Sequence, residues 1–452
     1  MYFTDMNKTP TFFLMLFLLA GLAGAQDRSL LRVLQADRLD GRLVGDIEYR
    51  ELVGNVRMQQ DNVRISCDRA MQNLTNNTVQ LSGNVVILQD TLELRTPRGD
   101  YDANTRVASS TSGVWLHDGH VTLSAAVGRY ETGSRVADFV SDVLIEDTSA
   151  TIRAGMMRYV RDSSLIVAWR RVRIRFKDEE ALILADSVRH YPDEKRSHFY
   201  HDPVLWQIDT AYQRRDADGG IDSLDLDTLN IAARYMEAHR DSSNRFLCEG
   251  EVRIVRSDFT ARCGMAHFLR SDSLIILREA PILWYGDNQL SGDSITARLE
   301  NDELRDLFVT GAAFSASRSK PSEEDTLYPP GRYDQTRGRD MHLRFLDSKA
   351  DYIRVDGAAT SLYYLYDEGA LNGVRLESGD VIIVSFAEGD AKTIRTLGGV
   401  EGTFYPEKYV NGKESGYNLE GFLWRDDRPA LLPWPEAVAP DAPGDAPAPP
   451  AQ

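Results

Sequence analysis

The chain has 452 residues and a formal net charge of −17, a length that suffices for a large core or an extended array of repeats. The acidic balance argues against nucleic acid as a partner, because binding to its phosphates needs basic patches. Three cysteines, Cys67, Cys248 and Cys263, lack metal-ligand spacing, and we expect neither a metal nor a cofactor. A Cys248–Cys263 disulfide and small core residues at Cys67 and Cys263 are both open interpretations.

Residues 1–25 have the order of a secretory signal peptide. A short polar stretch precedes an apolar run from Phe12 to Leu22, and Ala23-Gly24-Ala25 follows as a small-residue cleavage site. The run is too short for a membrane-spanning helix, although a membrane anchor is the alternative. We therefore expect the mature protein to be exported.

A repeat of 29 residues runs through the first half of the chain, as the numbers of its leading valines show. In each unit, two runs of alternating apolar and polar residues predict a pair of strands with one buried face. The apolar columns are expected to point inward. They comprise Val56, Met58, Ile65, Val85, Ile87, Leu92, Leu94, Val114, Leu116, Val121, Leu123, Val143, Ile145, Ile152, Val172, Ile174 and Ile183.

Later units are less regular. Val204 and Trp206 are expected to begin one of them with an inward strand, and Ile282 and Trp284 another, whereas Leu182 and Leu184 break the alternation. The expected segments are repeats at 26–206, an inserted acidic loop at 207–228, further repeats at 229–350 with a second loop at 315–340, a less regular β region or cap at 351–432, and a disordered Pro- and Ala-rich tail at 433–452.

Two interpretations of the inward columns are open. They either fill a closed core, as in a β-helix, or line a groove between two splayed sheets that holds an apolar ligand. One column is too small for a closed core of large aliphatic residues unless its packing is tight, and it consists of Cys67, Thr96, Ala125, Ala154 and Ala185. Another repeating column, Tyr101, Tyr130 and Tyr159, is interpreted as stacked aromatic rings.

Two short patterns recur in order along the chain. Leu52-Val53-Gly54-Asn55-Val56 and Leu81-Ser82-Gly83-Asn84-Val85 each precede a second strand, and Ile183-Leu184-Ala185-Asp186-Ser187-Val188 illustrates how such a strand ends. The chain thereby resembles the OstA/LptA family of lipopolysaccharide-transport proteins. The resemblance implies an all-β fold, a repeated-rung β-jelly-roll or β-solenoid-like V-shaped trough with an apolar interior.

The same resemblance implies a function. The inward columns would bind the acyl chains of lipopolysaccharide, or of a related lipid, while the protein carries it toward the outer membrane. It would act in the periplasm, with any association with the outer membrane made through partners. Inner- and outer-membrane transport components would be those partners, and edge strands would allow head-to-tail self-association.

The sequence gives little support for an enzyme. There is no Gly-rich phosphate loop, His-Glu-x-x-His helix or nucleophile elbow, so we expect no enzyme and no catalytic residue. One alternative is a β-helical protein that binds or cleaves polysaccharide, for which Asp222, Asp225 and Asp227 are the best carboxylates. Another alternative is a structural solenoid without a ligand.

Overall fold

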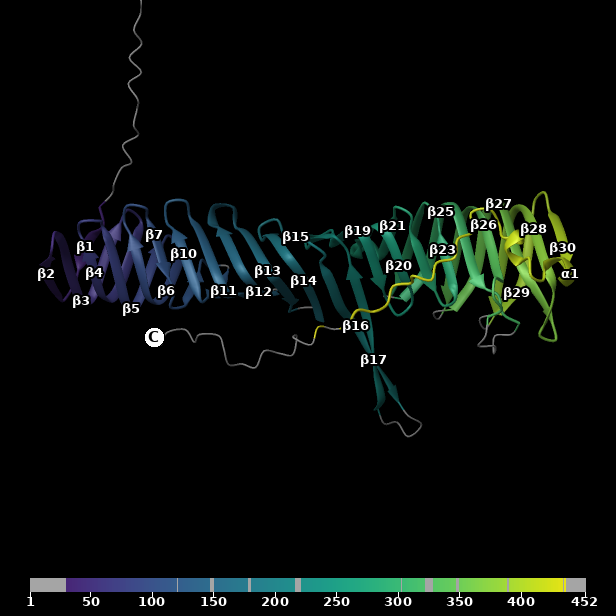
Figure 1. The fold of residues 1–452 in the computed structure, drawn as a ribbon, viewed down its shortest axis with the longest axis horizontal. Helices are drawn as coiled ribbons and strands as arrows, with labels where there is room; N and C mark the ends of the chain where they lie inside the picture. Colours follow the sequence, from purple (N-terminus) through teal and green to yellow (C-terminus); the bar gives the residue numbers. More distant parts are fainter. Residues whose placement is uncertain are drawn as a thin grey trace, which may run out of the picture.

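The protein is an elongated stack of antiparallel strands (Figure 1). The computed structural model describes residues 30–119, 121–146, 150–177, 180–215, 221–301, 303–321, 328–346, 349–387, 390–433 and 435, and over these residues thirty strands form one sheet. The expected signal peptide lies outside the described residues, as does the expected tail apart from Pro433 and Pro435. The all-β fold class is confirmed.

The strands follow one another along the stack in nearly sequential order. The first fourteen are β1 Arg32–Gln35, β2 Arg38–Val44, β3 Ile47–Gln60, β4 Val63–Asn73, β5 Thr78–Gln89, β6 Leu92–Asp102, β7 Val107–Ser110, β8 Val114–His117, β9 Thr122–Ala125, β10 Val127–Glu131, β11 Val136–Glu146, β12 Ala150–Val160, β13 Leu165–Phe176 and β14 Glu180–Tyr191. The next ten are β15 Arg196–Tyr200, β16 Val204–Arg215, β17 Ile221–Ala232, β18 Tyr235–His239, β19 Arg245–Val255, β20 Thr260–Leu269, β21 Leu274–Arg278, β22 Ile282–Tyr285, β23 Asn288–Ser291 and β24 Ser294–Glu300.

The C-terminal end of the stack has the longest strands. They are β25 Glu303–Arg318, β26 Tyr333–Leu346, β27 Lys349–Asp367 and β28 Ala370–Ala387, and the shorter strands β29 Asp390–Leu397 and β30 Glu401–Pro406 follow them. One helical turn, α1 Glu407–Val410, follows them, and short 3-10 turns occupy Arg161–Ser163, Arg270–Asp272 and Glu414–Tyr417.

A bend within each long strand folds the sheet into two arms. In β5, residues 78–82 pair with the end of β6 and residues 85–89 pair with its beginning. Gly83 and Asn84 lie between these stretches, with φ values of 70° and 48°. We call the arm that contains residues 85–89 and 92–96 arm A, and the arm that contains 78–82 and 98–102 arm B. The arms meet at the bends, which form the apex, and their free ends form the mouth.

The bend explains the repeated Gly-Asn pattern. Asn84 donates a hydrogen bond of 2.9 Å from Nδ2 to Oδ2 of Asp68 on the preceding strand, and Asn55 makes the same bond to Asp37. Pairs of consecutive left-handed residues recur along the stack, at 54–55, 83–84, 141–142, 170–171, 201–202, 250–251, 279–280, 311–312, 357–358 and 398–399. Each pair redirects one strand from one arm to the other.

The column of small residues also follows from the bend. Cys67 pairs with Val56, Thr96 with Val85 and Ala185 with Val172, each directly beside the left-handed pair. These positions face the inside of the apex, where the arms converge and only small buried side chains fit. The small column is therefore compatible with a filled interior and does not favour an open groove.

The expected insertions are more ordered than loops. Residues 207–228 belong mainly to β16 and β17, which pair with each other as a hairpin that projects from the side of the stack (Figure 1). Residues 315–318 and 333–340 likewise lie in β25 and β26. Local pairing of two strands satisfies the backbone polar groups of an insertion as well as a loop in water does, and composition alone does not distinguish them.

Most of the less regular β region, for which a cap was one of the open interpretations, continues the stack. Strands β27 to β30 pair in order with β26 and β28, and Val355, Ala359 and Ile382 extend the same core. After Tyr417 the chain becomes an extended strap, residues 418–433, which runs back over the outer face of arm A (yellow trace in Figure 1).

Amide side chains of the sheet hold the strap by its backbone. The Gln289 side chain donates to the Leu423 carbonyl at 2.6 Å and accepts from the Arg425 amide at 2.9 Å. At the far end, Trp206 donates from Nε1 to the Leu432 carbonyl at 3.2 Å. The strap thus covers side chains that would otherwise be exposed on the outside of the sheet.

The strap corrects the expected orientation of two tryptophans. Trp206 and Trp284 are buried but lie outside the core cluster, which contains their neighbours Leu205 and Leu283 instead. Leu182, which pairs with Trp206, is likewise buried outside that cluster. Both faces of the sheet are covered here, so apolar residues occur on both, and the alternation no longer identifies the inward face.

Replacement of Gly83 by alanine tests the bend. A Cβ at this position would lie 2.3 Å from Oδ2 of Asp68, and φ is +70°, so we expect a loss of at least about 1–2 kcal/mol of stability. The urea midpoint of unfolding measures it. Gly133→Ala is the matched control, because its nearest neighbour is Cδ of Arg106 at 3.9 Å; an equal shift for both variants would contradict the role of the bend.

Candidate functional site

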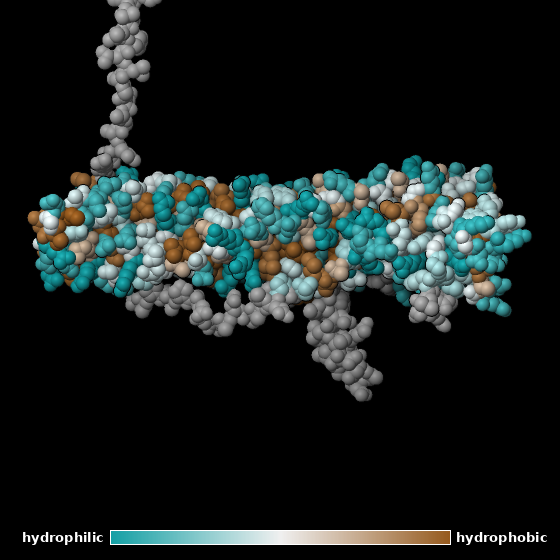
Figure 2. Space-filling model, viewed as in Figure 1, coloured by the Kyte–Doolittle hydropathy of each residue, from teal (hydrophilic) through white to brown (hydrophobic). Residues whose placement is uncertain are grey.

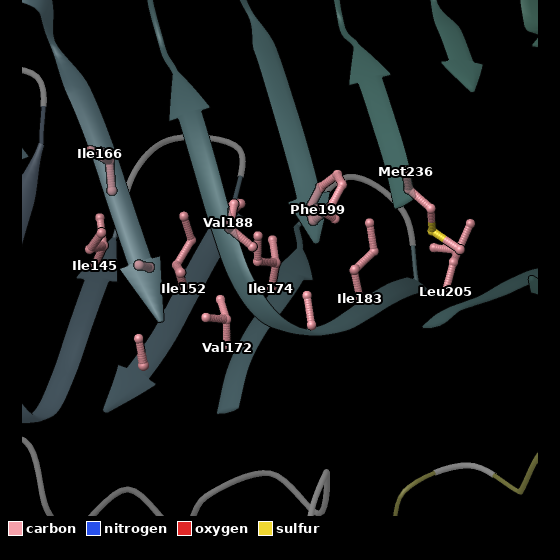
Figure 3. Packing of buried hydrophobic residues seen from close by; sticks show 14 of the residues in the cluster. Ile145, Ile152, Ile166, Val172, Ile174, Ile183, Val188, Phe199, Leu205 and Met236 are labelled. Atoms are coloured by element: carbon pink, nitrogen blue, oxygen red, sulfur yellow. The ribbon is translucent and has the colours of Figure 1, made fainter. Parts of the chain in front are cut away.

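The interior between the arms is the candidate site. All seventeen inward residues that the sequence predicts are buried in one core cluster, which runs from Leu31 near one end of the stack to Ile382 near the other. In Figure 3, Ile152, Ile174 and Ile183 of arm A lie near Val188 and Phe199 of arm B. The apolar columns therefore form one continuous apolar interior.

Apart from the tyrosine column, the contribution of arm B to this interior was missing from the sequence analysis. Arm B contributes buried residues such as Leu52, Leu81, Phe139 and Met157, which lie in short stretches away from the predicted columns. Their signal was present as a second alternation, for example Val79 and Leu81, just before each left-handed pair. It is short, and turns interrupt it, so it did not stand out.

A ladder of hydrogen bonds crosses the mouth in the N-terminal half. Tyr101 of arm B donates to Oε1 of Gln60 on arm A at 2.6 Å, and Tyr130 donates to Oε1 of Gln89 at 2.5 Å. Tyr159 makes the corresponding bond to Asp118. The repeating tyrosines, expected to be stacked rings, therefore tie one arm to the other through their hydroxyls.

The glutamines bond a second time across the mouth. Nε2 of Gln60 donates to the Ala103 carbonyl at 2.9 Å, and Nε2 of Gln89 donates to the Thr132 carbonyl at 3.0 Å. Both amides are almost completely buried. Because a buried amide that loses its partners is costly, these bonds hold the arms together.

Ion pairs lie on the solvent side of the ladder. Arg106 approaches Asp61 at 3.0 Å, and Asp90 meets Arg135 at 3.0 Å and Arg161 at 3.3 Å, in each case between a turn of arm B and a turn of arm A. The Asn62 side chain first, and the two arginines, hold the pKa of Asp90 below its usual value. The carboxylate is therefore ionised at neutral pH. We call the tyrosine bonds and these ion pairs together the latches.

Burial also keeps the tyrosines protonated. It is the main cause that raises the pKa of Tyr101 and of Tyr130 above the usual value. Their hydroxyls therefore remain donors throughout the neutral range. The latch residues repeat with the 29-residue period, Gln60 with Gln89 and Tyr101 with Tyr130 with Tyr159, and this joint recurrence was the signal that sequence reasoning missed.

The latched interior is filled. A cavity lined by Leu81, Val85, Ile87 and Leu94 has a volume of only about 10 Å³. Larger hollows, of about 500 and 180 Å³, lie under the strap, beside Arg262 and Trp424 respectively. The apolar columns thus pack against each other in this state, and a ligand between them requires the arms to part.

The described residues form neither a metal site nor the carboxylate site of the polysaccharide alternative. No group of three or more His, Cys, Asp or Glu side chains is placed to hold a metal ion there. Asp225 and Asp227 lie in β17, where their backbone pairs with β16, and their side chains are outside the described set. No helix in the described part of the chain is long and apolar enough to cross a membrane.

The cysteines are free and buried, so the Cys248–Cys263 disulfide, one of the two alternatives, is not formed. Burial raises the pKa of the Cys67 thiol to about 11 and that of Cys263 to about 12. Thiols protected in this way behave as small apolar core residues.

The first part of the chain is similar to a known protein family. Residues 28–186 match the family described as OstA-like protein. A solved structure from Pseudomonas aeruginosa also aligns, LptH, described as the LptA-homologous periplasmic component of the conserved lipopolysaccharide transport device. The identity is 11%, the TM-score 0.25, and the alignment covers 33% of this chain and 95% of that one. No curated protein matches.

Replacement of Tyr130 by phenylalanine tests the ladder. The change leaves Oε1 of Gln89 without its buried donor, so we expect a loss of about 1–3 kcal/mol of stability, read from the urea midpoint. Tyr49→Phe provides the control, because Tyr49 is half-buried near the N-terminal end and is not a latch residue. If both variants unfolded at the same midpoint as the wild type, the ladder would make no contribution to stability.

Proposed function

We propose, from the match of residues 28–186 to the OstA-like family, that the protein carries lipopolysaccharide, or a similar lipid, through the periplasm toward the outer membrane. Acyl chains would lie between the arms, while the sugar and phosphate head stays in water. Inner- and outer-membrane transport components would deliver and receive the lipid. The proposal includes no chemical step.

The observation that carries the proposal is the continuity of the apolar interior along the whole stack. Each methylene group that moves from water into an apolar environment contributes about 0.8 kcal/mol. A lipid with several long chains therefore needs shelter at every point of an aqueous path. Because the columns repeat rung by rung, the apolar contacts offered to an acyl chain would be similar along the stack.

The cost of parting the arms is compatible with this function. Acyl chains would replace apolar contacts between the arms with contacts of the same kind. The main free-energy cost of parting the arms is therefore the loss of the hydrogen bonds and ion pairs of the latches. A neutral hydrogen bond contributes about 0.5–1.5 kcal/mol. The Arg106–Asp61 pair has side chains 36% and 46% exposed, and such pairs contribute about 0–1 kcal/mol.

Photo-crosslinking to lipopolysaccharide tests the carrier function. A diazirine-bearing residue of about the size of leucine would replace Leu123 or Ile254, which face the interior, in the mature protein. Thr122 and Arg253 are the matched controls, because each is the neighbour on the same strand that points the other way. We expect crosslinks from at least one inward position and from neither control.

The result separates a carrier from a solid core. Crosslinks from inward positions alone would support lipid between the arms. A folded protein that gives none from any inward position, or equal yields from both faces, would contradict the proposal and favour a structural solenoid.

The ends of the stack support head-to-tail association. Strands β1 and β2 pair only with β3 among the described strands, and β29 and β30 pair only with β28. Leu43 is 72% exposed at one end, where Figure 2 shows apolar residues, and Phe404 is 46% exposed at the other. Open edges that carry apolar side chains are suited to pairing with a like edge.

Lysine at either end should weaken this association. We expect Leu43→Lys and Phe404→Lys to shift the protein toward smaller species in sedimentation velocity at increasing concentration. Leu88→Lys is the control, since Leu88 is 38% exposed within the stack and away from both edges. A wild-type protein that stays monomeric at every concentration, or a control that dissociates equally, would refute end-to-end contacts.

A further inference from the structure

Two tryptophans of arm A lie beneath the strap and differ in the surroundings of the indole N–H. Trp206 in β16 donates to the Leu432 carbonyl at 3.2 Å. Trp284 in β22 is only 3% exposed, and within the described part of the chain its Nε1 has no hydrogen-bond acceptor. Buried donors in native proteins nearly always have a partner. The indole N–H of Trp284 is therefore available to an acceptor on a ligand.

A hollow of about 180 Å³, lined in part by Trp284, lies between the sheet and the strap. The sheet contributes Asp287 and Arg318 to its lining, and the strap contributes Trp424 and Arg428. The strap crosses the sheet here beside β20 and β23 (yellow trace in Figure 1). A hollow needs only about 10–15 Å³ to hold one water molecule, so this one has room for a ligand the size of a monosaccharide.

Both signs of charge line the hollow. Arg428 donates from Nη1 to a backbone carbonyl at 2.9 Å. Asp426 accepts from Nη2 of Arg318 at 2.8 Å, and Asp287 accepts from the Tyr328 hydroxyl at 2.6 Å. A carboxylate has about four acceptor sites, so both aspartates can accept further bonds. A small anion would meet the carboxylates and a cation would meet the guanidinium groups, whereas a neutral group that donates and accepts finds partners of both kinds.

Aromatic rings supply the apolar part of the lining. The guanidinium carbon of Arg318 lies 5.3 Å from the ring centroid of Trp424 and 5.6 Å from that of Tyr328. Together with Trp284, these two rings provide apolar surface at the hollow. Ligand pockets typically combine aromatic walls with a few placed polar groups. A sugar ring matches this lining, because its C–H groups form an apolar face and each of its hydroxyls both donates and accepts.

We propose that this hollow, the strap pocket, binds a saccharide. The Trp284 N–H donates to a sugar oxygen, Asp287 and Asp426 accept from sugar hydroxyls, and the aromatic rings contact the C–H face. The pocket lies on the outer face of arm A, whereas acyl chains would lie in the interior, so this proposal does not depend on the carrier function. It includes no cleavage step. The sugar part of a lipopolysaccharide and a free glycan share the chemistry that the pocket recognises.

Titration calorimetry with three probes tests the class of ligand. The probes are the oligosaccharide that mild acid releases from lipopolysaccharide, soluble fragments of cell-wall glycan, and citrate as an anion without a sugar ring. With the mature protein, we expect at least one saccharide to bind at least tenfold more tightly than citrate. The tighter saccharide identifies the source, a lipid head group or a free glycan. Binding of neither saccharide, or equal binding of citrate, would overturn the strap pocket.

Removal of the indole N–H should weaken this binding. We expect Trp284→Phe to bind the saccharide at least tenfold more weakly, while Trp115→Phe binds it as tightly as the wild type does. Trp115 is the matched control, because it is half-buried on the outer face of arm A, in β8 and away from the strap. Unchanged affinity in a folded Trp284 variant would overturn the assignment.

An isosteric residue covers the case that Trp284→Phe misfolds. Benzothienylalanine keeps the shape of tryptophan and has sulfur in place of the N–H. At position 284 we expect it to leave the urea midpoint of the free protein unchanged and to weaken saccharide binding at least tenfold. At position 206 it removes the bond to Leu432 and should lower the midpoint. An equal loss of stability at both positions would show that the Trp284 N–H already has a partner, and would overturn the pocket.

Crosslinking distinguishes failure of the strap pocket from failure of the carrier. Lipopolysaccharide crosslinks at Leu123 or Ile254 without any saccharide binding would refute the pocket and leave the carrier intact. Saccharide binding that depends on Trp284, in a protein that gives no crosslinks from any inward position, would support the pocket and refute the carrier.

Discussion

The pair of left-handed residues in each rung is the constraint on which the interior depends. Without a turn at positions such as 83–84, the strands would form a flat sheet, and the apolar columns would face water. Left-handed backbone costs residues other than glycine about 1–2 kcal/mol each, yet Arg170 and Arg171 adopt it. Such residues persist because the paired strands on both sides leave the chain no other path. One local feature, repeated, thus creates both arms and the space between them.

The two sides of the stack differ in strength as a result. At the apex, every rung is joined by its own backbone, so the arms cannot separate there. At the mouth they are joined by side chains alone, such as Tyr130 with Gln89 and Arg135 with Asp90. Any separation of the arms is therefore a rotation about the apex, and the residues at the mouth determine its cost. Because these residues change along the stack, different rungs open at different cost.

Alternation with period two was sufficient to predict arm A, because each of its strands in the N-terminal half has one face toward water. It failed at Trp206 and Trp284, where the strap buries the other face as well. The bonds across the mouth were missed for a different reason: the glutamines and tyrosines share the 29-residue period, but Gln60 and Tyr101 are 41 residues apart, and only the bend brings them together. Local periodicity reveals which side of a strand is buried, whereas pairing across the interior depends on where the chain turns.

The strap has a consequence for the order in which the chain folds. Rungs of the stack bind their sequence neighbours, so they can form one after another as the chain becomes available from its N-terminus. Trp206, by contrast, can make its hydrogen bond only when Leu432, which is 226 residues away in the sequence, has docked. Such long-range contacts form slowly. Until the strap docks, Trp206 and the outer face of arm A beside it therefore stay exposed to water.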